Sequence, residues 1–270
     1  MTSVCRSEAL RFWKRLGCTS LTFNAPMSGH TGPELAPELE RHGVGMVILG
    51  GYPGDDATYR ASKLVARRRD EFAVPPDRLP EELSRVDVEI PVAVNVRFAD
   101  PREAGELSGE LADLVDVVEI NAHCRQPEIV RAGAGEALLE DRTRLIEIVE
   151  AVAEHDVYVS VKLRGPHPAF EDALEALRDS SVDVLHVDAM KPGEPTYELE
   201  YVRAAARVGV PVIGNNSVRT PEDVDRMFEA GASAVSVGRP ILEGDWDVLE
   251  RLVRYTVLRK SSEGAGLART

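Results

Sequence analysis

Cys124 stands directly after an apolar run, in the stretch VEINAHCRQPE at residues 118–128. A thiol there can donate a proton in a reaction when cationic neighbours favour its ionised form, and His123 and Arg125 flank it. A cysteine near a loop also packs as a small hydrophobic residue. We therefore expect Cys124 to be either a catalytic proton donor, with His123 as the next candidate, or a packing residue.

Lys162 lies inside another apolar run, VYVSVKLR at residues 157–164. An ammonium group is costly to bury without a partner. This lysine therefore predicts an anionic or electron-rich ligand, and a salt bridge inside the fold is the alternative. Asn95 and Asn121 also end apolar runs, but an asparagine there often only caps a turn.

Two glycines in the last quarter of the chain predict a phosphate site. Gly214 precedes Asn215, and Gly238 precedes Arg239, each pair at the end of an apolar run. A glycine lets backbone N–H groups approach an anion, and a guanidinium adds charged donors. The alternative is that both stretches are ordinary turns.

The elements that must position these residues alternate regularly. Short runs rich in Val and Ile cover residues 21–25, 44–50, 90–96, 115–121, 157–163, 182–188, 210–215 and 232–238. Amphipathic helical patterns lie between them, which is typical of βαβ units and a parallel sheet. Eight such units predict a (β/α)₈ TIM barrel, with its active site at the C-terminal ends of the strands. An open doubly wound sheet is the alternative, although no GxGxxG follows the first run.

The whole chain, residues 1–270, is expected to form one TIM-barrel domain. It carries a short N-terminal extension, an excursion at about residues 50–88 and a polar C-terminal tail. Thr220 reads as a helix N-cap, and Gly209 and Gly231 read as helix stops.

The composition restricts the classes of function. A net charge of -14 disfavours nucleic-acid binding, because phosphate contacts supply most of that affinity. Only 5 of the 32 basic residues are lysine. Adaptation to high salt or heat is therefore an alternative reason for the acidic surface.

Three cysteines without CxxC spacing argue against a zinc site, a redox pair or a secreted disulfide scaffold, so we expect no metal. No segment has the length and apolarity of a signal peptide or a membrane span. We expect a cytoplasmic protein without membrane contact, and a homo-oligomer stays open.

Five segments resemble tRNA-dihydrouridine synthases, in order along the chain. They are NAPMSGHTG (24–32), PVAVNVRFADP (91–101), EINAHCRQPEIVRAGAGEALL (119–139), VSVKLR (159–164) and PVIGNNSVRTPEDVDRMFEAGASAVSVGRPIL (211–242). Together they cover most of the chain between about residues 20 and 245. The Cys124 segment and the Gly238-Arg239 segment carry the resemblance jointly.

This resemblance implies an FMN-containing barrel. The reduced cofactor would give a hydride to a uracil-like ring, and Cys124 would protonate that ring. The implied partner is a small-molecule or uracil-containing substrate, and tRNA is one candidate for it. The cofactor-binding positions that the resemblance implies are Pro26, Met27, Asn95, Asn121, Lys162, Gly214, Asn215, Gly238 and Arg239.

Several positions depart from the family pattern. His123 and Arg125 stand where glycine and proline usually flank the cysteine, and Asp188 stands where the sixth strand usually ends in histidine. Asn216-Ser217 replaces a common Gly-Asp, and the C-terminal helical domain that grips tRNA has no counterpart in this sequence. An aspartate near a phosphate or flavin anion would repel it unless Asp188 pairs with a cation, such as Lys162 or Arg164.

Three functions follow as hypotheses. The first is a flavin-dependent reductase of a uracil-like ring. The second is an FMN oxidoreductase for a small soluble molecule, similar to dihydroorotate dehydrogenases. The third is a barrel without cofactor that acts as a binding protein. The sequence also resembles a short archaeal branch of barrel proteins related to the tRNA-dihydrouridine synthases.

Overall fold

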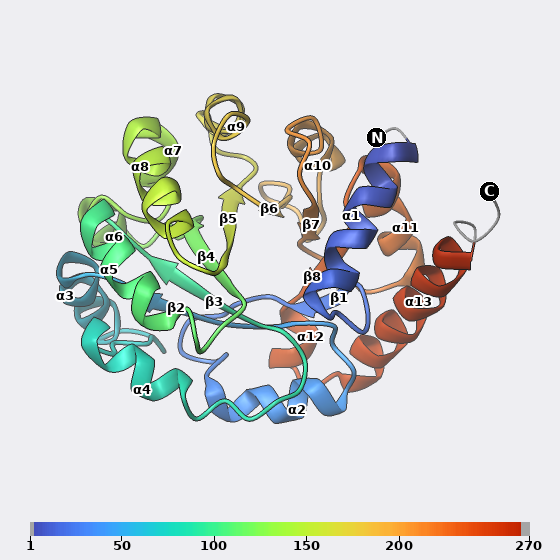
Figure 1. Ribbon diagram of the computed structural model, residues 1–270, viewed down its shortest axis with the longest axis horizontal. Coiled ribbons are helices and arrows are strands. Elements are labelled where there is room, and N and C mark those ends of the chain that lie inside the picture. The colour runs from blue at the N-terminus through green and yellow to red at the C-terminus, as the bar shows by residue number, and fades with distance from the viewer. Residues whose placement is uncertain (1–2, 266–270) are drawn as a thin grey trace.

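The computed structural model describes residues 3–265, and its centre is a barrel of eight parallel strands (Figure 1). The strands are β1 (Thr22–Asn24), β2 (Val47–Pro53), β3 (Val92–Arg97), β4 (Val117–Ala122), β5 (Tyr158–Arg164), β6 (Val184–Asp188), β7 (Val212–Asn215) and β8 (Ala234–Val237). Hydrogen bonds join them in the order β1-β8-β7-β6-β5-β4-β3-β2. The predicted TIM barrel is thus confirmed.

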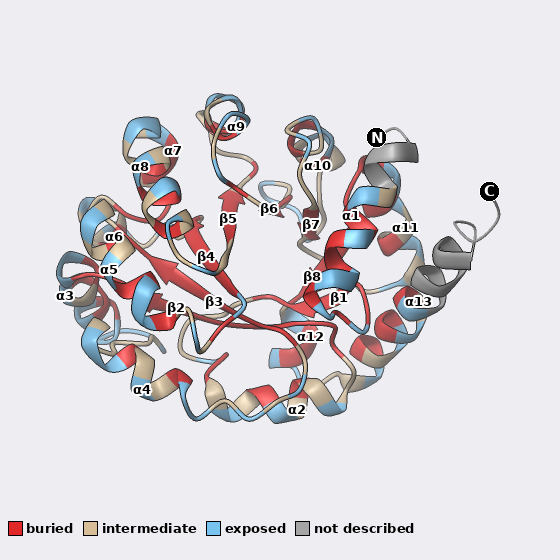
Figure 2. Ribbon diagram, viewed as in Figure 1, coloured by how far each residue is buried: buried red, intermediate tan, exposed pale blue. Residues whose placement is uncertain are grey.

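Helices surround the strands and turn their apolar faces inward (Figure 2). They are α1 (Ser3–Leu16), α2 (Ala36–Arg41), α3 (Asp56–Val65), α4 (Leu79–Leu83), α5 (Pro101–Leu111), α6 (Pro127–Arg131), α7 (Ala137–Glu140), α8 (Arg142–Ala153), α9 (Phe170–Leu177), α10 (Leu199–Ala205), α11 (Pro221–Ala230), α12 (Arg239–Leu242) and α13 (Trp246–Ala265), with the 3₁₀ turns η1 (Pro33–Leu35) and η2 (Pro76–Arg78). The Thr220 side chain caps α11, and Gly231 ends it with φ 113°, as predicted. None of the helices within residues 3–265 has the length and apolarity to cross a membrane.

The Asn24 side chain and one backbone hydrogen bond close the barrel between β1 and β2. Asn24 accepts a hydrogen bond from the Ile48 N–H at 2.8 Å and donates one to the Ile48 carbonyl at 2.7 Å. The Gly45 N–H also donates to the Thr22 carbonyl at 2.9 Å. Because the first and last strands of the order meet in this way, the open-sheet alternative is wrong.

The second strand differs from its prediction at both ends. The apolar run begins at residue 44, but β2 begins at Val47 and continues through two glycines to Pro53. Tyr52 pairs with Val96 and Pro53 with Arg97, after a register shift at the glycines. Pairing with β3 therefore extends the strand where the side-chain pattern gives no signal.

The long excursion after β2 is tied to the barrel by a buried ion pair. Arg97, at the end of β3, lies 2.5 Å from a carboxylate oxygen of Glu71, and both side chains are 1% exposed. Arg97 also donates to Ser28 Oγ at 3.1 Å. These contacts hold the chain between α3 and α4 over the ends of the first three strands.

The N-terminal helix α1 covers the opposite end of the barrel. Its Trp13 is fully buried and donates from Nε1 to Ser233 Oγ, just before β8, at 2.9 Å. Trp13 also meets the Phe23 ring edge-on at 5.2 Å between centroids. The amino-terminal end of the barrel is therefore filled, and the C-terminal strand ends are left for a site.

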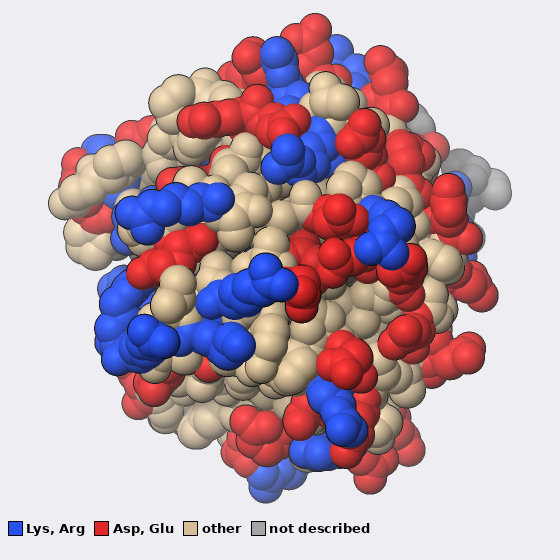
Figure 3. Space-filling view, turned by 90° about the vertical axis from the view of Figure 1, so that its left-hand side faces the viewer, with Lys and Arg blue, Asp and Glu red and all other residues tan. Residues whose placement is uncertain are grey.

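The surface around α3, α5 and α6 carries both charges, with basic side chains gathered on part of it (Figure 3). We call the exposed residues after α3 and around α6 the arginine flank: Arg67, Arg68, Arg69, Arg125 and Arg131. Arg68 ties the two segments together through Glu128 at 2.6 Å and Gln126 at 2.9 Å. The flank adjoins the loop that holds His123 and Cys124.

Replacing Asn24 with alanine should weaken closure of the barrel. It leaves the buried Ile48 N–H and carbonyl without partners, so we expect a loss of about 3 kcal/mol in the free energy of unfolding, measured in urea. Ser181→Ala removes an exposed contact to Glu150 and should change stability by less than about 0.5 kcal/mol. Equal losses in both variants would contradict the role given to Asn24.

Candidate functional site

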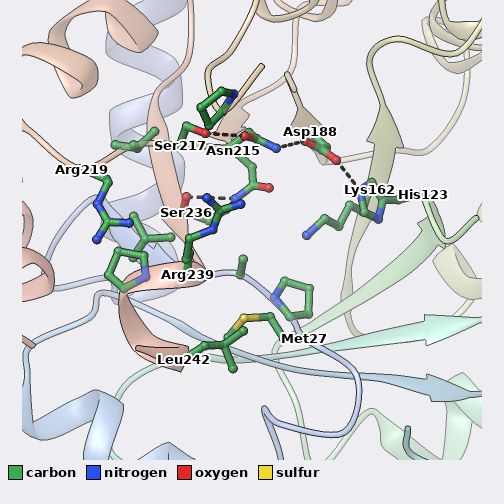
Figure 4. Close-up of a pocket in the computed structure, with 18 residues that line it drawn as sticks. Met27, His123, Lys162, Asp188, Asn215, Ser217, Arg219, Ser236, Arg239 and Leu242 are labelled. Atoms are coloured by element: carbon green, nitrogen blue, oxygen red, sulfur yellow. Dashed lines mark hydrogen bonds and ion pairs between the residues drawn. The ribbon is translucent and has the colours of Figure 1, made fainter. Parts of the chain in front are cut away.

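A pocket of about 470 Å³ opens at the C-terminal ends of the strands (Figure 4). Seven of the predicted site residues line it: Pro26, Met27, His123, Lys162, Asn215, Gly238 and Arg239. They come from the loops after β1 and β4, from the strands β5 and β7, and from the start of α12. The fold thus gathers residues that lie far apart in the sequence.

The ends of β7 and β8 form one wall of the pocket. A side chain at Gly238 would lie 3.0 Å from Met27 Sδ, so the glycine allows close approach of β8 to the loop after β1. Arg219 is held by Glu243 at 3.0 Å and Asp245 at 3.4 Å. For Arg239, no side-chain partner is found among the described residues. Its guanidinium is therefore available for an anion.

The loop after β7 has an unusual backbone. Asn216 and Ser217 have φ of 100° and 52°, in the left-handed region that is costly for side chains other than glycine. Asn216 donates from Nδ2 to Asp188 Oδ1 at 2.8 Å, and Ser217 donates to Asn216 Oδ1 at 2.7 Å. These contacts stabilise the loop and orient both side chains at the pocket.

Lys162 extends from β5 into the pocket, as Figure 4 shows. The residue is 3% exposed. Within residues 3–265, its Nζ has no hydrogen bond or ion pair. Burial lowers the pKa of Lys162, while the charges of Glu119 and Asp188 raise it in part. The salt-bridge alternative therefore has no close contact to support it, and the ammonium faces open space.

His123 and Asp188 form the shortest side-chain pair of the pocket. His123 Nε2 lies 2.5 Å from Asp188 Oδ2, and Arg164 Nη1 lies 3.7 Å from the same oxygen. Burial raises the pKa of Asp188, but His123, Asn216 and Lys162 outweigh this and hold it well below its usual range. An imidazole able to carry a proton thus stands beside Lys162.

Four predicted site residues do not line the pocket. The half-buried Cys124 packs against a small cluster formed by Ala61, Val65, Ile129 and Ala134. A side chain at Gly214 would lie 2.9 Å from Met227 Sδ, so this glycine serves the packing of α11. The other two, Asn95 and Asn121, lie inside the barrel.

Asn121 shapes the loop rather than the pocket surface. Its Oδ1 accepts hydrogen bonds from the backbone N–H of His123 at 3.1 Å and of Cys124 at 2.8 Å. Its Nδ2 donates to Asn95 Oδ1 at 2.7 Å. This contact fixes where the two candidate proton donors stand.

Other pocket residues were not predicted as site residues, notably Arg219 and Ser236. Ser236 alternates with apolar residues in ASAVSVG, which indicates a side chain that points into the barrel. Glu119 and His186 carry the same signal, two positions before Asn121 and Asp188. No pattern in the sequence singles out Arg219.

Comparisons with known proteins find similar chains. An uncharacterized protein of Methanocaldococcus jannaschii is 32% identical over 247 residues, 86% of this chain and 93% of that protein. A probable tRNA-dihydrouridine synthase of Treponema pallidum is 31% identical over 176 residues, 56% of this chain and about half, 51%, of that relative. A DHODH structure from Eimeria tenella, in complex with ferulenol, matches in fold with a TM-score of 0.66 at 15% identity, over 90% of this chain and 82% of that one. No protein-family model matches the sequence.

The chain belongs to the tRNA-dihydrouridine synthase-like family of TIM barrels. Within this family, two of its departures compensate each other. Histidine usually ends the sixth strand, and here Asp188 takes that place while His123 brings an imidazole to it from the loop after β4. Asp188 is therefore held by a hydrogen bond with His123 and by the charge of Arg164 at 3.7 Å.

The Asp188 carboxylate should contribute stability that depends on pH. Its pKa is lower in the folded than in the unfolded protein, so its contribution is present above about pH 4 and is lost as the pH falls through the folded-state pKa. We expect Asp188→Asn to cost about 2 kcal/mol at pH 7 and progressively less below about pH 4, measured by urea unfolding.

The matched control is Asp172→Asn, which removes an exposed carboxylate 3.3 Å from Arg142. It should change stability by less than about 0.5 kcal/mol at any pH. A cost for Asp188→Asn that is the same at pH 3 and pH 7 would contradict the assignment.

Proposed function

We propose that this protein is an FMN-dependent oxidoreductase that transfers a hydride between FMN and a uracil-like ring. The observation that carries the proposal is the Lys162 ammonium, buried and without a close partner, in a pocket that also holds Arg239. Two cations in an acidic protein favour an anionic ligand. Relatives named tRNA-dihydrouridine synthase support the choice of reaction.

The residues present fit FMN. Arg239 and the backbone around Gly238 suit its phosphate, and the apolar surfaces of Pro26 and Met27 suit its ring. Lys162 suits the electron-rich edge of that ring. When bound, FMN supplies the hydride chemistry, and the protein binds, orients and handles the proton.

The proton at the substrate has two candidate donors. His123 lies in the pocket and its ring is held by Asp188, whereas Cys124 adjoins it in sequence but packs against the cluster of α3 and α6. A histidine fixed by a carboxylate is suited to hold and transfer a proton near neutral pH. The geometry therefore favours His123 as the donor, with Cys124 as the family-based alternative.

FMN binding is tested first. We expect the purified protein to be yellow or to bind added FMN, and Arg239→Ala to weaken binding about tenfold or more because a charged hydrogen bond to phosphate is lost. Fluorescence titration measures the dissociation constant. Arg178→Ala, at the exposed end of α9, is the control. A colourless protein that does not bind FMN in titration would leave the third hypothesis, a barrel without cofactor.

The proton donor is tested by two variants that should both retain FMN. His123→Gln keeps a hydrogen-bond donor for Asp188 but cannot transfer a proton, so turnover should fall about a hundredfold or more. Cys124→Ala should retain turnover if His123 is the donor. Loss of turnover in Cys124→Ala alone would restore the thiol to this role. Dihydrouridine in tRNA from a strain without its own synthases is the readout.

The arginine flank supports tRNA as the substrate. Replacing Arg67, Arg69 and Arg131 with alanine should weaken binding of labelled, unmodified tRNA and reduce its salt dependence by up to about three phosphate contacts. The control removes three exposed arginines elsewhere on the surface: Arg178 after α9, Arg207 after α10 and Arg251 on α13. Equal losses in both triple variants would show unspecific attraction. FMN binding without dihydrouridine formation would favour a small soluble substrate.

A further inference from the structure

A chain of hydrogen bonds crosses the barrel beneath the pocket. His186 on β6 lies 2.8 Å through Nδ1 from Glu119 Oε2 on β4, and 2.7 Å through Nε2 from Ser236 Oγ on β8. Asn215 on β7 donates to Ser236 Oγ at 2.8 Å, and Asn95 on β3 donates to Glu119 Oε1 at 2.7 Å. Glu119 and His186 are at most 1% exposed and do not line the pocket.

One assignment of protons satisfies these bonds with a neutral imidazole. The Ser236 hydroxyl accepts a bond from Asn215 Nδ2 and can donate its own proton to His186 Nε2, because a hydroxyl is both donor and acceptor. His186 Nδ1–H then donates to the Glu119 carboxylate. In this assignment the imidazole is neutral and the carboxylate is ionised.

The pKa values follow the same direction. Burial, followed by the charge of Lys162, lowers the pKa of His186. Burial raises the pKa of Glu119, but His186, the charge of Lys162 and the hydrogen bond from Asn95 outweigh it and hold the pKa below its usual range. Glu119 is therefore an anion at neutral pH.

Lys162 lies on β5 two positions after Ser160, which donates to Glu119 at 3.1 Å, so the side chains of Lys162 and Glu119 share the interior of the barrel. The charged or titratable groups around Lys162 are Glu119 on β4, His186 and Asp188 on β6, His123 after β4, and Arg239 across the pocket. Asp188 is already engaged by His123 at 2.5 Å and by Asn216 at 2.8 Å. Because a neutral His186 does not compensate the charge of Glu119, the negative charge of this buried carboxylate acts on Lys162.

Packing alone does not explain an ionised group at this depth. Barrel interiors are usually filled by layers of branched apolar side chains, and a buried carboxylate without a cation is costly. Glu119 accepts three side-chain hydrogen bonds, from Asn95, Ser160 and His186. These donors hold a negative charge in place without neutralising it.

We propose that Glu119 is the counter-ion of Lys162, fixed by a neutral His186, and that Glu119 and His186 together keep Lys162 positively charged in the pocket. Glu119 and His186 are positioning residues, since neither lines the pocket. The inference rests on the proposed function only for the identity of the anion that the pocket binds.

The first test measures Lys162 itself in the protein without added ligand. The chain has only five lysines, so ¹³C-lysine labelling gives few signals. The signal that is missing in Lys162→Arg is the signal of Lys162. Glu119→Gln keeps the shape of the side chain and removes its charge. It should lower the pKa of Lys162 by about one unit or more.

The control, Asp116→Asn, removes a carboxylate that accepts from the Val92 N–H at the other end of the barrel. It should shift Lys162 by less than about 0.3 units, because the charge is distant and partly exposed to solvent. An unchanged Lys162 pKa in Glu119→Gln, or equal shifts in both variants, would overturn the proposal.

A second measurement needs no variant. The ¹⁵N shifts of His186 in the unaltered protein should show a neutral ring with its proton on Nδ1 at pH 7. A cationic His186 would cancel the charge of Glu119 and overturn the proposal, even if Glu119→Gln does not fold.

FMN titration then separates the two proposals. If FMN binds, Glu119→Gln should weaken it more at about pH 9 than at about pH 6, since Lys162 loses its proton earlier in the variant. An equal loss at both pH values would count against the pair. If FMN does not bind the unaltered protein, the proposed function fails, while the Lys162 and His186 measurements still decide this inference.

Discussion

The burial of a lysine ammonium at the mouth of the barrel is the constraint on which the site depends. Lys162 is 3% exposed, and an ammonium at such depth needs negative charge nearby. Carboxylates on both neighbouring strands meet this need, Glu119 on β4 and Asp188 on β6. Each is in turn held by histidine and amide groups. The polar interior of this barrel is therefore organised around one positive charge that faces the pocket.

The two carboxylates differ in how they are satisfied. Asp188 is paired at the pocket surface with His123, a side chain able to carry a proton. Glu119 is hydrogen-bonded inside the barrel to His186 Nδ1, and His186 Nε2 is hydrogen-bonded to Ser236 Oγ. One histidine is thus placed where a ligand can reach it, and the other is sealed from solvent. Similar chemical pairs serve different purposes because their burial differs.

The departures from the dihydrouridine synthase pattern lie where the structure places them in contact. His123 and Asp188 compensate each other, and Asn216 supports Asp188 from the loop after β7. The cysteine of the family pattern is retained in sequence, yet its side chain packs toward α3 and α6. The pocket is therefore lined by basic side chains, among them Lys162 and Arg239, and by an imidazole rather than a thiol.

The sequence by itself determined the barrel and the order of the site residues along it. Runs of Val and Ile at regular spacing specify buried parallel strands, and polar residues at their ends specify which end carries the site. Tertiary structure alone decided which of those side chains meet. His123 and Asp188 are 65 positions apart, and Cys124 turns away although it is adjacent to His123. Such contacts depend on strand register and loop path, which bring distant residues together and leave no periodic pattern in the sequence.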